Sequence, residues 1–212
     1  MISIDLVPQG MAPLTVKQIP VGTMANFVYL VVDPSSLESL VVDSGWETSP
    51  ILRAVEESNS KVKYLVATHG HFDHVGTLGE AAQSLGAQVV AHRDSPVPHD
   101  ISVEEGDELR LGRHSVTVFH TPGHTPDSIC LYDGEHLFTG DTLFIGTIGK
   151  FGKEWSEDMF ESLQRLTRLP DRTVVYPGHD YGEVPCRTLG EEKSSNPFLL
   201  TSDLRSFLSA FA

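Results

Sequence analysis

The chain of 212 residues is 40% hydrophobic and 21% charged, and its formal net charge is −14. This composition excludes a chain that is disordered throughout, because it supplies enough apolar residues for one sizeable core. The strong negative charge repels phosphates, so we expect no binding to nucleic acid and no attraction to anionic membranes.

Cysteine usage and hydropathy predict the compartment. The two cysteines, Cys130 and Cys186, lie far apart, which gives no disulfide framework, and Cys130 is predicted to be a buried, inert thiol. Residues 1–10 contain no Lys or Arg and no long apolar run, so they do not resemble a secretory signal. No stretch approaches the roughly 18 apolar residues of a membrane span. We therefore expect a cytoplasmic protein.

Four runs in the first third of the chain have the apolar patterning of strands. They lie at residues 14–19, 27–32, 40–43 and 63–67. The run at 27–32 is nearly continuous, as in a strand that is buried on both faces.

Candidate capping residues predict where three helices begin and end. Ser49 is a candidate N-cap, and Pro50 suits the first helical position, where its missing N–H costs nothing. A second helix is predicted over residues 76–85, with Gly86 placed to end it. Ser156 is predicted to cap a third helix whose first turn is acidic.

The second half of the chain continues the strand pattern. Strand-like runs lie at residues 88–91, 109–111, 116–119, 128–132, 137–138 and 173–176. One short helix is predicted in the tail after Pro197. Because strands and helices are mixed and no linker separates them, the sequence predicts one α/β domain over residues 1–212.

Four of the strand-like runs lead into a short turn that contains glycine and a candidate metal ligand. The candidates are His69, His71, Asp73, His74, His124, Asp141 and His179. Ligand sites collect at the carboxyl ends of strands in α/β sheets, so we expect these seven side chains to converge.

The spacing of these residues predicts two metal ions. His69 and His71 are two residues apart, so an extended backbone points both toward one ion. Asp73 and His74 follow after the chain turns, which suits a second ion nearby. Asp141 has two carboxylate oxygens and could bridge both ions. The two remaining histidines would complete one ion each.

The donor set indicates a reaction class. Imidazole and carboxylate without thiolate suits zinc, iron or manganese. Two ions roughly 3.5–4 Å apart can hold a hydroxide and polarise a substrate oxygen, which favours hydrolysis of a carbonyl compound. A metal-binding module without catalysis is the alternative from another class. The remaining histidines are predicted to be surface or packing residues: His92, His99, His114, His120 and His136.

These motifs resemble the metallo-β-lactamase superfamily over about residues 28–200, with the H-x-H-x-D-H signature at residues 69–74 and the other segments in the family's order. The resemblance implies an α/β fold of four layers, an αββα sandwich with two sheets face to face. It also implies a first ion on His69, His71 and His124, a second ion on Asp73, His74 and His179, and Asp141 as the bridge.

Within the superfamily, the chain resembles the glyoxalase II and persulfide dioxygenase branch. Residues 138–144 read F-T-G-D-T-L-F, and residues 191–198 resemble an E-R-x-x-N-P-F ending, with Lys193 where Arg usually stands. The resemblance implies that Lys150 and Tyr181 bind the substrate, as the matching residues contact glutathione in glyoxalase II.

The expected function is therefore a metal-dependent hydrolase, of the hydroxyacylglutathione hydrolase type, that cleaves a thioester with a metal-bridging hydroxide. Asp73 and Asp141 are the expected catalytic residues. The expected cofactors are two divalent ions, zinc first, with iron or a mixed zinc and iron pair as alternatives. The expected partner is a small molecule, a glutathione or other thiol conjugate. A homodimer is left open.

Two other activities stay open. A mononuclear iron persulfide dioxygenase would use His69, His124 and Asp141, and a lactonase would share the ligand set. Because the sequence ends at Ala212, we expect none of the helical C-terminal domain that supplies much of the glutathione site in longer glyoxalase II enzymes. That favours the dioxygenase, whereas Lys150 favours the hydrolase, because the dioxygenase pattern usually has Arg there.

Overall fold

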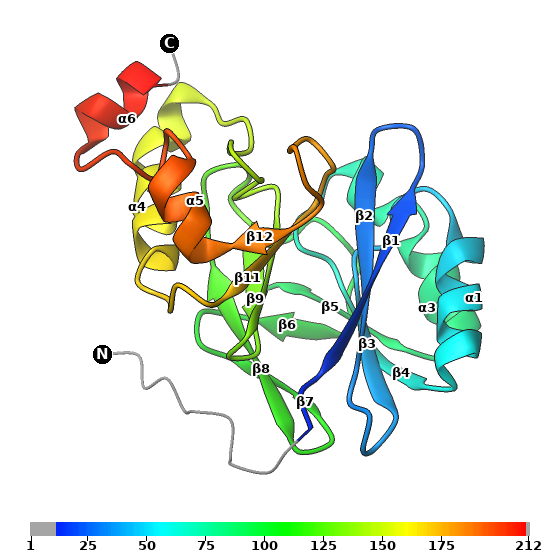
Figure 1. The fold of residues 1–212 in the computed structure, drawn as a ribbon. Coiled ribbons are helices and arrows are strands. Elements are labelled where there is room, and N and C mark those ends of the chain that lie inside the picture. The colour runs from blue at the N-terminus through cyan, green and yellow to red at the C-terminus, as the bar shows by residue number, and fades with distance from the viewer. Residues whose placement is uncertain (1–11, 211–212) are drawn as a thin grey trace.

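The structure is a computed structural model that describes residues 12–210. Within these residues, two six-stranded sheets pack face to face, with helices on the outer face of each (Figure 1). The proposed absence of a secretory signal rests on residues 1–10, which lie outside the described residues. The assignment of a single domain to residues 1–212 stays a prediction.

The first sheet has the strand order β1-β2-β3-β4-β5-β6. Its strands are β1 (Thr15–Val21), β2 (Asn26–Val32), β3 (Glu38–Val42), β4 (Lys61–Val66), β5 (Gln88–His92) and β6 (Ile101–Val103). The pairs from β3 to β6 are parallel, and parallel neighbours need a crossover connection. The crossovers between β3 and β5 are made by α1 (Thr48–Ser58), α2 (Phe72–Val75) and α3 (Leu78–Leu85).

Strand β2 shows why the sheets stack. All seven of its residues are buried, as the continuous apolar run predicts. Tyr29 and Val31 point into the apolar cluster between the two sheets. Val28 and Leu30 point the other way, into the cluster that α1 and α3 cover. One strand with two apolar faces therefore joins two cores.

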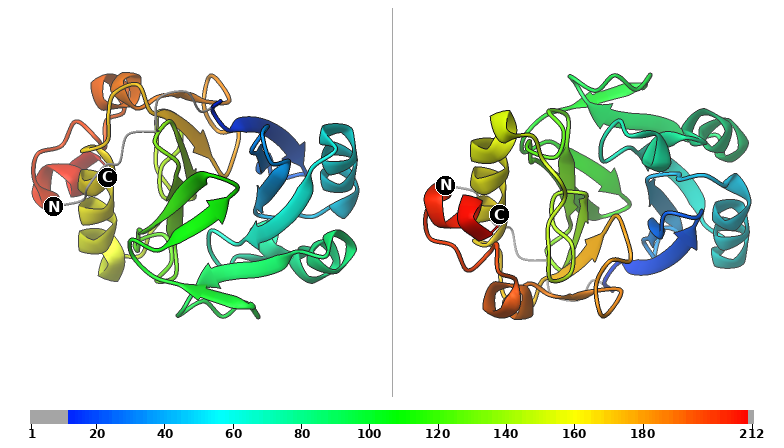
Figure 2. Two further views of the ribbon diagram at one scale, coloured as in Figure 1. Left: turned by 90° about the horizontal axis from the view of Figure 1, so that it is seen from below. Right: turned by 90° about the horizontal axis from the view of Figure 1, so that it is seen from above.

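The second sheet has the order β12-β11-β10-β9-β8-β7. Its strands are β7 (Glu108–Leu111), β8 (His114–His120), β9 (Ile129–Tyr132), β10 (His136–Gly140), β11 (Val174–Pro177) and β12 (Arg187–Thr188). Its outer face is covered by the short turn η1 (Lys153–Trp155) and by α4 (Ser156–Leu166), α5 (Leu189–Ser195) and α6 (Leu204–Ala210). The two end-on views show helix, sheet, sheet and helix layers, which confirms the αββα sandwich (Figure 2).

The helix starts differ from the predictions. Helix α1 begins one residue before Ser49, which caps nothing, since Glu47 holds the N-cap position without a side-chain bond. The helix predicted over residues 76–85 is α3, which begins two residues later, at Leu78, and a separate helix of four residues, α2, ends just before it at Val75. Ser156 is the first residue of α4, and its hydroxyl donates back to the carbonyl of the preceding η1 turn.

Five short described elements were not predicted: α2, β6, η1, β12 and α5. Strand β6 has only three residues, too few to show alternation. Helix α5 is polar and short, but Thr188 and Glu191 form a full capping box at its start. Among residues 12–210, no helix is both long and apolar enough to cross a bilayer.

Candidate metal centre

The candidate ligands lie where four strands end. Strand β4 of the first sheet leads into His69, and three strands of the second sheet, β8, β10 and β11, lead into His124, Asp141 and His179. The general rule for α/β sheets concerns the strand ends of a single sheet. The ends instead come from both layers of the sandwich, so the site lies at one edge of the sandwich, between the sheets (Figure 1).

Three imidazoles form the first half of the site. The Nδ1 atom of His71 lies 3.1 Å from Nε2 of His69 and 2.9 Å from Nε2 of His124. All three nitrogens fall within 4.8 Å of one another, close enough to share one ion. Sequence spacing and family resemblance predict this same grouping.

Asp73, His74 and His179 form the second half. The Nε2 atoms of His74 and His179 are 3.2 Å apart, and Oδ2 of Asp73 is 3.3 Å from Nε2 of His179. These three donor atoms also lie within 4.8 Å of one another. Asp73 and His74 reach this position because α2 begins directly after His71 and turns them away from the first half.

Asp141 lies between the two halves. Its Oδ1 atom is 3.2 Å from Nε2 of His74, while its Oδ2 atom is 3.5 Å from Nε2 of His124 and 3.4 Å from Nε2 of His179. Its carboxylate therefore contacts members of both groups, as a bridging ligand must.

Backbone carbonyls fix the ring orientation of two histidines. His124 donates from Nδ1 to the carbonyl of Lys150 at 2.7 Å, and His179 donates from Nδ1 to the carbonyl of Met24 at 2.9 Å. A carbonyl can only accept, so Nδ1 carries the hydrogen in both rings. In the neutral ring, Nε2 then presents a lone pair to the centre.

Asp43 does the same for the two most deeply placed rings. His74 donates from Nδ1 to Oδ2 of Asp43 at 2.8 Å. The Thr68 hydroxyl also donates to Asp43, at 2.9 Å. The oxygen of that hydroxyl therefore accepts a hydrogen bond from Nδ1 of His69, at 3.1 Å. In their neutral forms, these four rings would aim lone pairs at one small region, an arrangement that a cation stabilises.

A buried oxygen of Asp141 and a glycine beside it also suit a bound cation. The Oδ1 atom of Asp141 is buried and has no hydrogen bond of acceptable geometry among the described residues. A Cβ atom at Gly178 would lie 2.5 Å from that oxygen, so glycine keeps the space open. The donor set and the space therefore both suit divalent ions with nitrogen and oxygen ligands.

The electrostatics of the centre lead to the same conclusion. Burial would lower the pKa of His74, but the carboxylates of Asp43 and Asp141 raise it well above its ordinary value. Burial would raise the pKa of Asp141, but the nearby rings of His179 and His74 hold it well below its usual range. Burial also holds the pKa of His69 well below its usual value, which keeps that ring neutral. The buried carboxylates of Asp43 and Asp141 are stabilised by positive charge nearby, which either protons on the histidines or metal ions supply.

A cavity of about 300 Å³ opens onto the centre. Its apolar wall is formed by Met24, Phe144 and Ile148, and Lys150 and Tyr181 also line it. Tyr181 is 53% exposed. The structure thus places both predicted substrate-binding residues in one cavity with five of the candidate ligands: His71, Asp73, His124, Asp141 and His179.

The segment at residues 191–198 supports one side of this cavity. Glu192 is fully buried and accepts a hydrogen bond from the backbone N–H of Gly146 at 2.9 Å. Asn196 donates to Glu192 and to the carbonyl of Thr147, at 2.9 and 3.1 Å. The motif therefore ties α5 to the loop that carries Ile148 and leads to Lys150.

Sequence reasoning missed several residues that contact the candidate ligands. It included Asp43 in the strand-like run at residues 40–43 and gave it no role, although Asp43 follows strand β3 and the strand-end criterion that selected Asp141 would also have selected it. Asn26 gave no such signal, because it stands at the start of its strand and not at the end. The carbonyls of Met24 and Lys150 could not have been found, since backbone atoms leave no mark on residue type.

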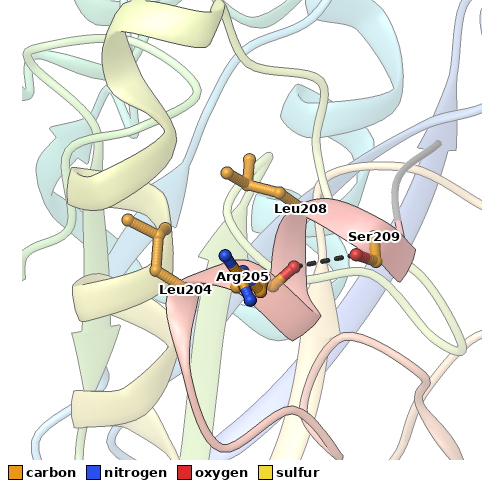
Figure 3. Close-up of a pocket in the computed structure, with 4 residues that line it drawn as sticks. All are labelled: Leu204, Arg205, Leu208 and Ser209. Carbon is orange, nitrogen blue, oxygen red and sulfur yellow. Dashed lines mark hydrogen bonds between the residues drawn. The ribbon is translucent and has the colours of Figure 1, made fainter.

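The other histidines and the cysteines lie outside the three ligand groups. His92 is buried and its ring stacks on that of His120, with centroids 4.0 Å apart. Cys130 is buried, and burial raises the pKa of its thiol to about 11. A separate surface pocket is lined by Leu204, Arg205, Leu208 and Ser209 of α6, none of them a candidate site residue (Figure 3).

Comparison with known proteins places this fold and site. Residues 21–179 match the Metallo-beta-lactamase superfamily. The chain is 36% identical over 161 residues to a hydroxyacylglutathione hydrolase of Pelagibacter ubique, covering 74% of this chain and 67% of that protein. It is 32% identical over 198 residues to the human mitochondrial persulfide dioxygenase ETHE1, covering 90% and 78%.

Solved structures give the same result. The crystal structure of ETHE1 from Myxococcus xanthus superimposes with a TM-score of 0.85 at 31% identity, covering 92% of this chain and 88% of that one. The protein TTHA1623, solved in a di-iron-bound form, superimposes with a TM-score of 0.73 at 31% identity, covering 87% and 100%.

Fold and site together define a metal-binding protein with the metallo-β-lactamase architecture. The chain belongs to the metallo-beta-lactamase superfamily, and its relatives place it in the glyoxalase II and persulfide dioxygenase-like branch.

Proposed function

We propose that this protein is a metal-dependent hydrolase that cleaves a 2-hydroxyacyl thioester of glutathione or of a similar thiol. The observation that carries the proposal is the cavity in which Lys150 and Tyr181 lie beside the candidate ligands. A cation and a phenol next to a two-ion centre suit an anionic thiol conjugate whose carbonyl reaches the ions.

The residues divide the chemical task. Two divalent ions, when bound, supply an activated water at neutral pH and polarise the thioester carbonyl. Asp141 holds the two halves at a fixed separation, and Asp73, whose side chain faces the cavity, orients the attacking water. Lys150 and Tyr181 bind the anionic part of the substrate. One water is consumed, the carbonyl–sulfur bond breaks, and a carboxylic acid and a thiol are released.

The second candidate is a mononuclear iron persulfide dioxygenase. The specific observation in its favour is structural similarity: the ETHE1 structure from Myxococcus xanthus superimposes over 92% of this chain with a TM-score of 0.85, and the human persulfide dioxygenase carries the same name. The candidate iron ligands would be His69, His124 and Asp141. Lys150 supports the hydrolase instead, since resemblance to the dioxygenases would put Arg at that position.

Side-by-side assays separate the two activities. The metal-loaded protein is given a 2-hydroxyacyl glutathione thioester, and thiol release is followed; separately, it is given a glutathione persulfide, and oxygen uptake is followed. We expect thioester turnover without oxygen uptake. His99→Gln, which changes a histidine outside the centre, should retain turnover, whereas Asp141→Ala should abolish it. Oxygen uptake without thioester turnover would reject the hydrolase.

A further inference from the structure

Asn26 is a buried amide, 1% exposed, at the first position of strand β2. Its Nδ2 atom donates to Oδ2 of Asp73 at 2.9 Å and to the backbone carbonyl of Asp73 at 3.2 Å. Both hydrogen bonds that this amide donates therefore go to Asp73, one of the candidate ligands.

Trp46 fixes which way the amide points. Its Nε1–H lies 3.3 Å from Oδ1 of Asn26, and an indole nitrogen can only donate. The oxygen of the amide must therefore face Trp46, which leaves the NH₂ group facing Asp73. Trp46 is itself held by an edge-to-face contact with Phe72, with ring centroids 5.0 Å apart.

The position of Asp73 depends on hydrogen bonds from outside its own helix. Asp73 lies on α2, a helix of four residues with no side-chain cap, and it is less buried than His74 and His179. A carboxylate oxygen has two lone pairs, so Oδ2 can accept from Asn26 with one and bind an ion with the other. Without Asn26, the carboxylate would be free to rotate away from His179.

Residues 24–27, the segment that carries Asn26, contact the second half of the site. Met24 supplies the carbonyl that orients His179, and the backbone of Asn26 pairs with that of His179. The next residue, Phe27, donates from its N–H to the carbonyl of Gly178 at 2.8 Å. The first half takes its ring orientation from other residues, Thr68 and Lys150.

We infer that Asn26 is a positioning residue that holds Asp73 for the second ion, so that occupancy of one half of the site depends on it and occupancy of the other half does not. The inference rests on the two-ion centre of the proposed function. Trp46 acts through Asn26, since its N–H sets the direction of the amide.

Titration of metal-free protein with Co²⁺ alone, followed by its visible absorption, tests this inference. Wild-type protein should bind two equivalents. Asn26→Ala should bind one equivalent with wild-type affinity and the other about 10- to 100-fold more weakly, the usual effect of losing a residue that orients a ligand. The weakened step must be the one that His179→Ala removes. Trp46→Phe, which keeps the ring beside Phe72, should weaken the same step to a smaller extent.

Ser162→Ala is the matched control. It removes another buried hydrogen-bonding side chain, which bonds the carbonyl of Pro122, and should bind both equivalents as wild type does. Wild-type affinity for both ions in Asn26→Ala, or equal weakening of both steps, would overturn the inference while leaving the two-ion proposal intact. A wild-type protein that binds one equivalent would overturn both.

Discussion

The phenol ring of Tyr181 lies parallel to the imidazole of His179, with centroids 4.6 Å apart and planes 9° from parallel. The same phenol meets Phe144 edge to face at 5.3 Å. These contacts hold an exposed ring over the mouth of the cavity, where its hydroxyl is free to contact a substrate.

Tyr181→Phe should therefore separate binding from chemistry. The variant keeps the ring stack and loses only the hydroxyl, so KM should rise by roughly 2- to 10-fold, as for one hydrogen bond of about 0.5–1.5 kcal/mol, with kcat nearly unchanged. Steady-state thioester kinetics measure both constants. An unchanged KM would remove the hydroxyl from the substrate site.

Gly149 is not a candidate ligand, but Gly149→Ala should still disrupt the metal centre. A Cβ atom at Gly149 would lie 1.7 Å from the backbone oxygen of Asp141, so either residue must move. We expect a loss of about 1–3 kcal/mol in the free energy of unfolding, together with reduced metal content. Denaturant unfolding and metal analysis of the purified variant test both effects.

Gly79→Ala is the paired control. Gly79 lies in α3, and a Cβ there meets nothing within 4 Å. This substitution should stabilise the protein by about 0.5–1 kcal/mol, because glycine is the poorer helix former. If both variants behave alike, close packing against Asp141 is not what requires glycine at residue 149.

The two thiols should react differently. At pH 8, Cys130 is buried and protonated, because burial raises its pKa to about 11. Cys186 is half-buried, with a pKa that burial raises above 9.0, so its reaction rate should still be rising at pH 9 as the thiolate fraction grows. An aromatic disulfide reagent should modify one thiol in native protein and two in denaturant. Cys186→Ser should abolish the native reaction; rapid modification of both thiols would contradict the assignment.

Much of the fold was predictable because apolar patterning carries it. The continuous run at residues 27–32 predicted a strand buried on both faces, and β2 is one. Helix boundaries were less predictable, because Ser49 has the right chemistry for a cap but lies one residue inside α1. Local preference cannot register a one-residue offset that packing against the sheet decides.

The clustering of the candidate ligands was predictable, because their side chains carry the signal. All seven candidate ligands converge, because the strand ends that hold them meet at one edge of the sandwich. The residues that orient them were not predictable. Asn26 lies 47 positions before Asp73 in the sequence, and only the fold brings its amide to that carboxylate.

Metal stoichiometry tests the central claim most directly. Purified protein, loaded and then freed of excess metal, is analysed for bound ions while its thioester turnover and oxygen uptake are measured. The two-ion hydrolase predicts two divalent ions per chain, thioester turnover without oxygen uptake, and loss of both metal and turnover in Asp141→Ala. One iron per chain, with oxygen uptake from a persulfide and no thioester turnover, would contradict it.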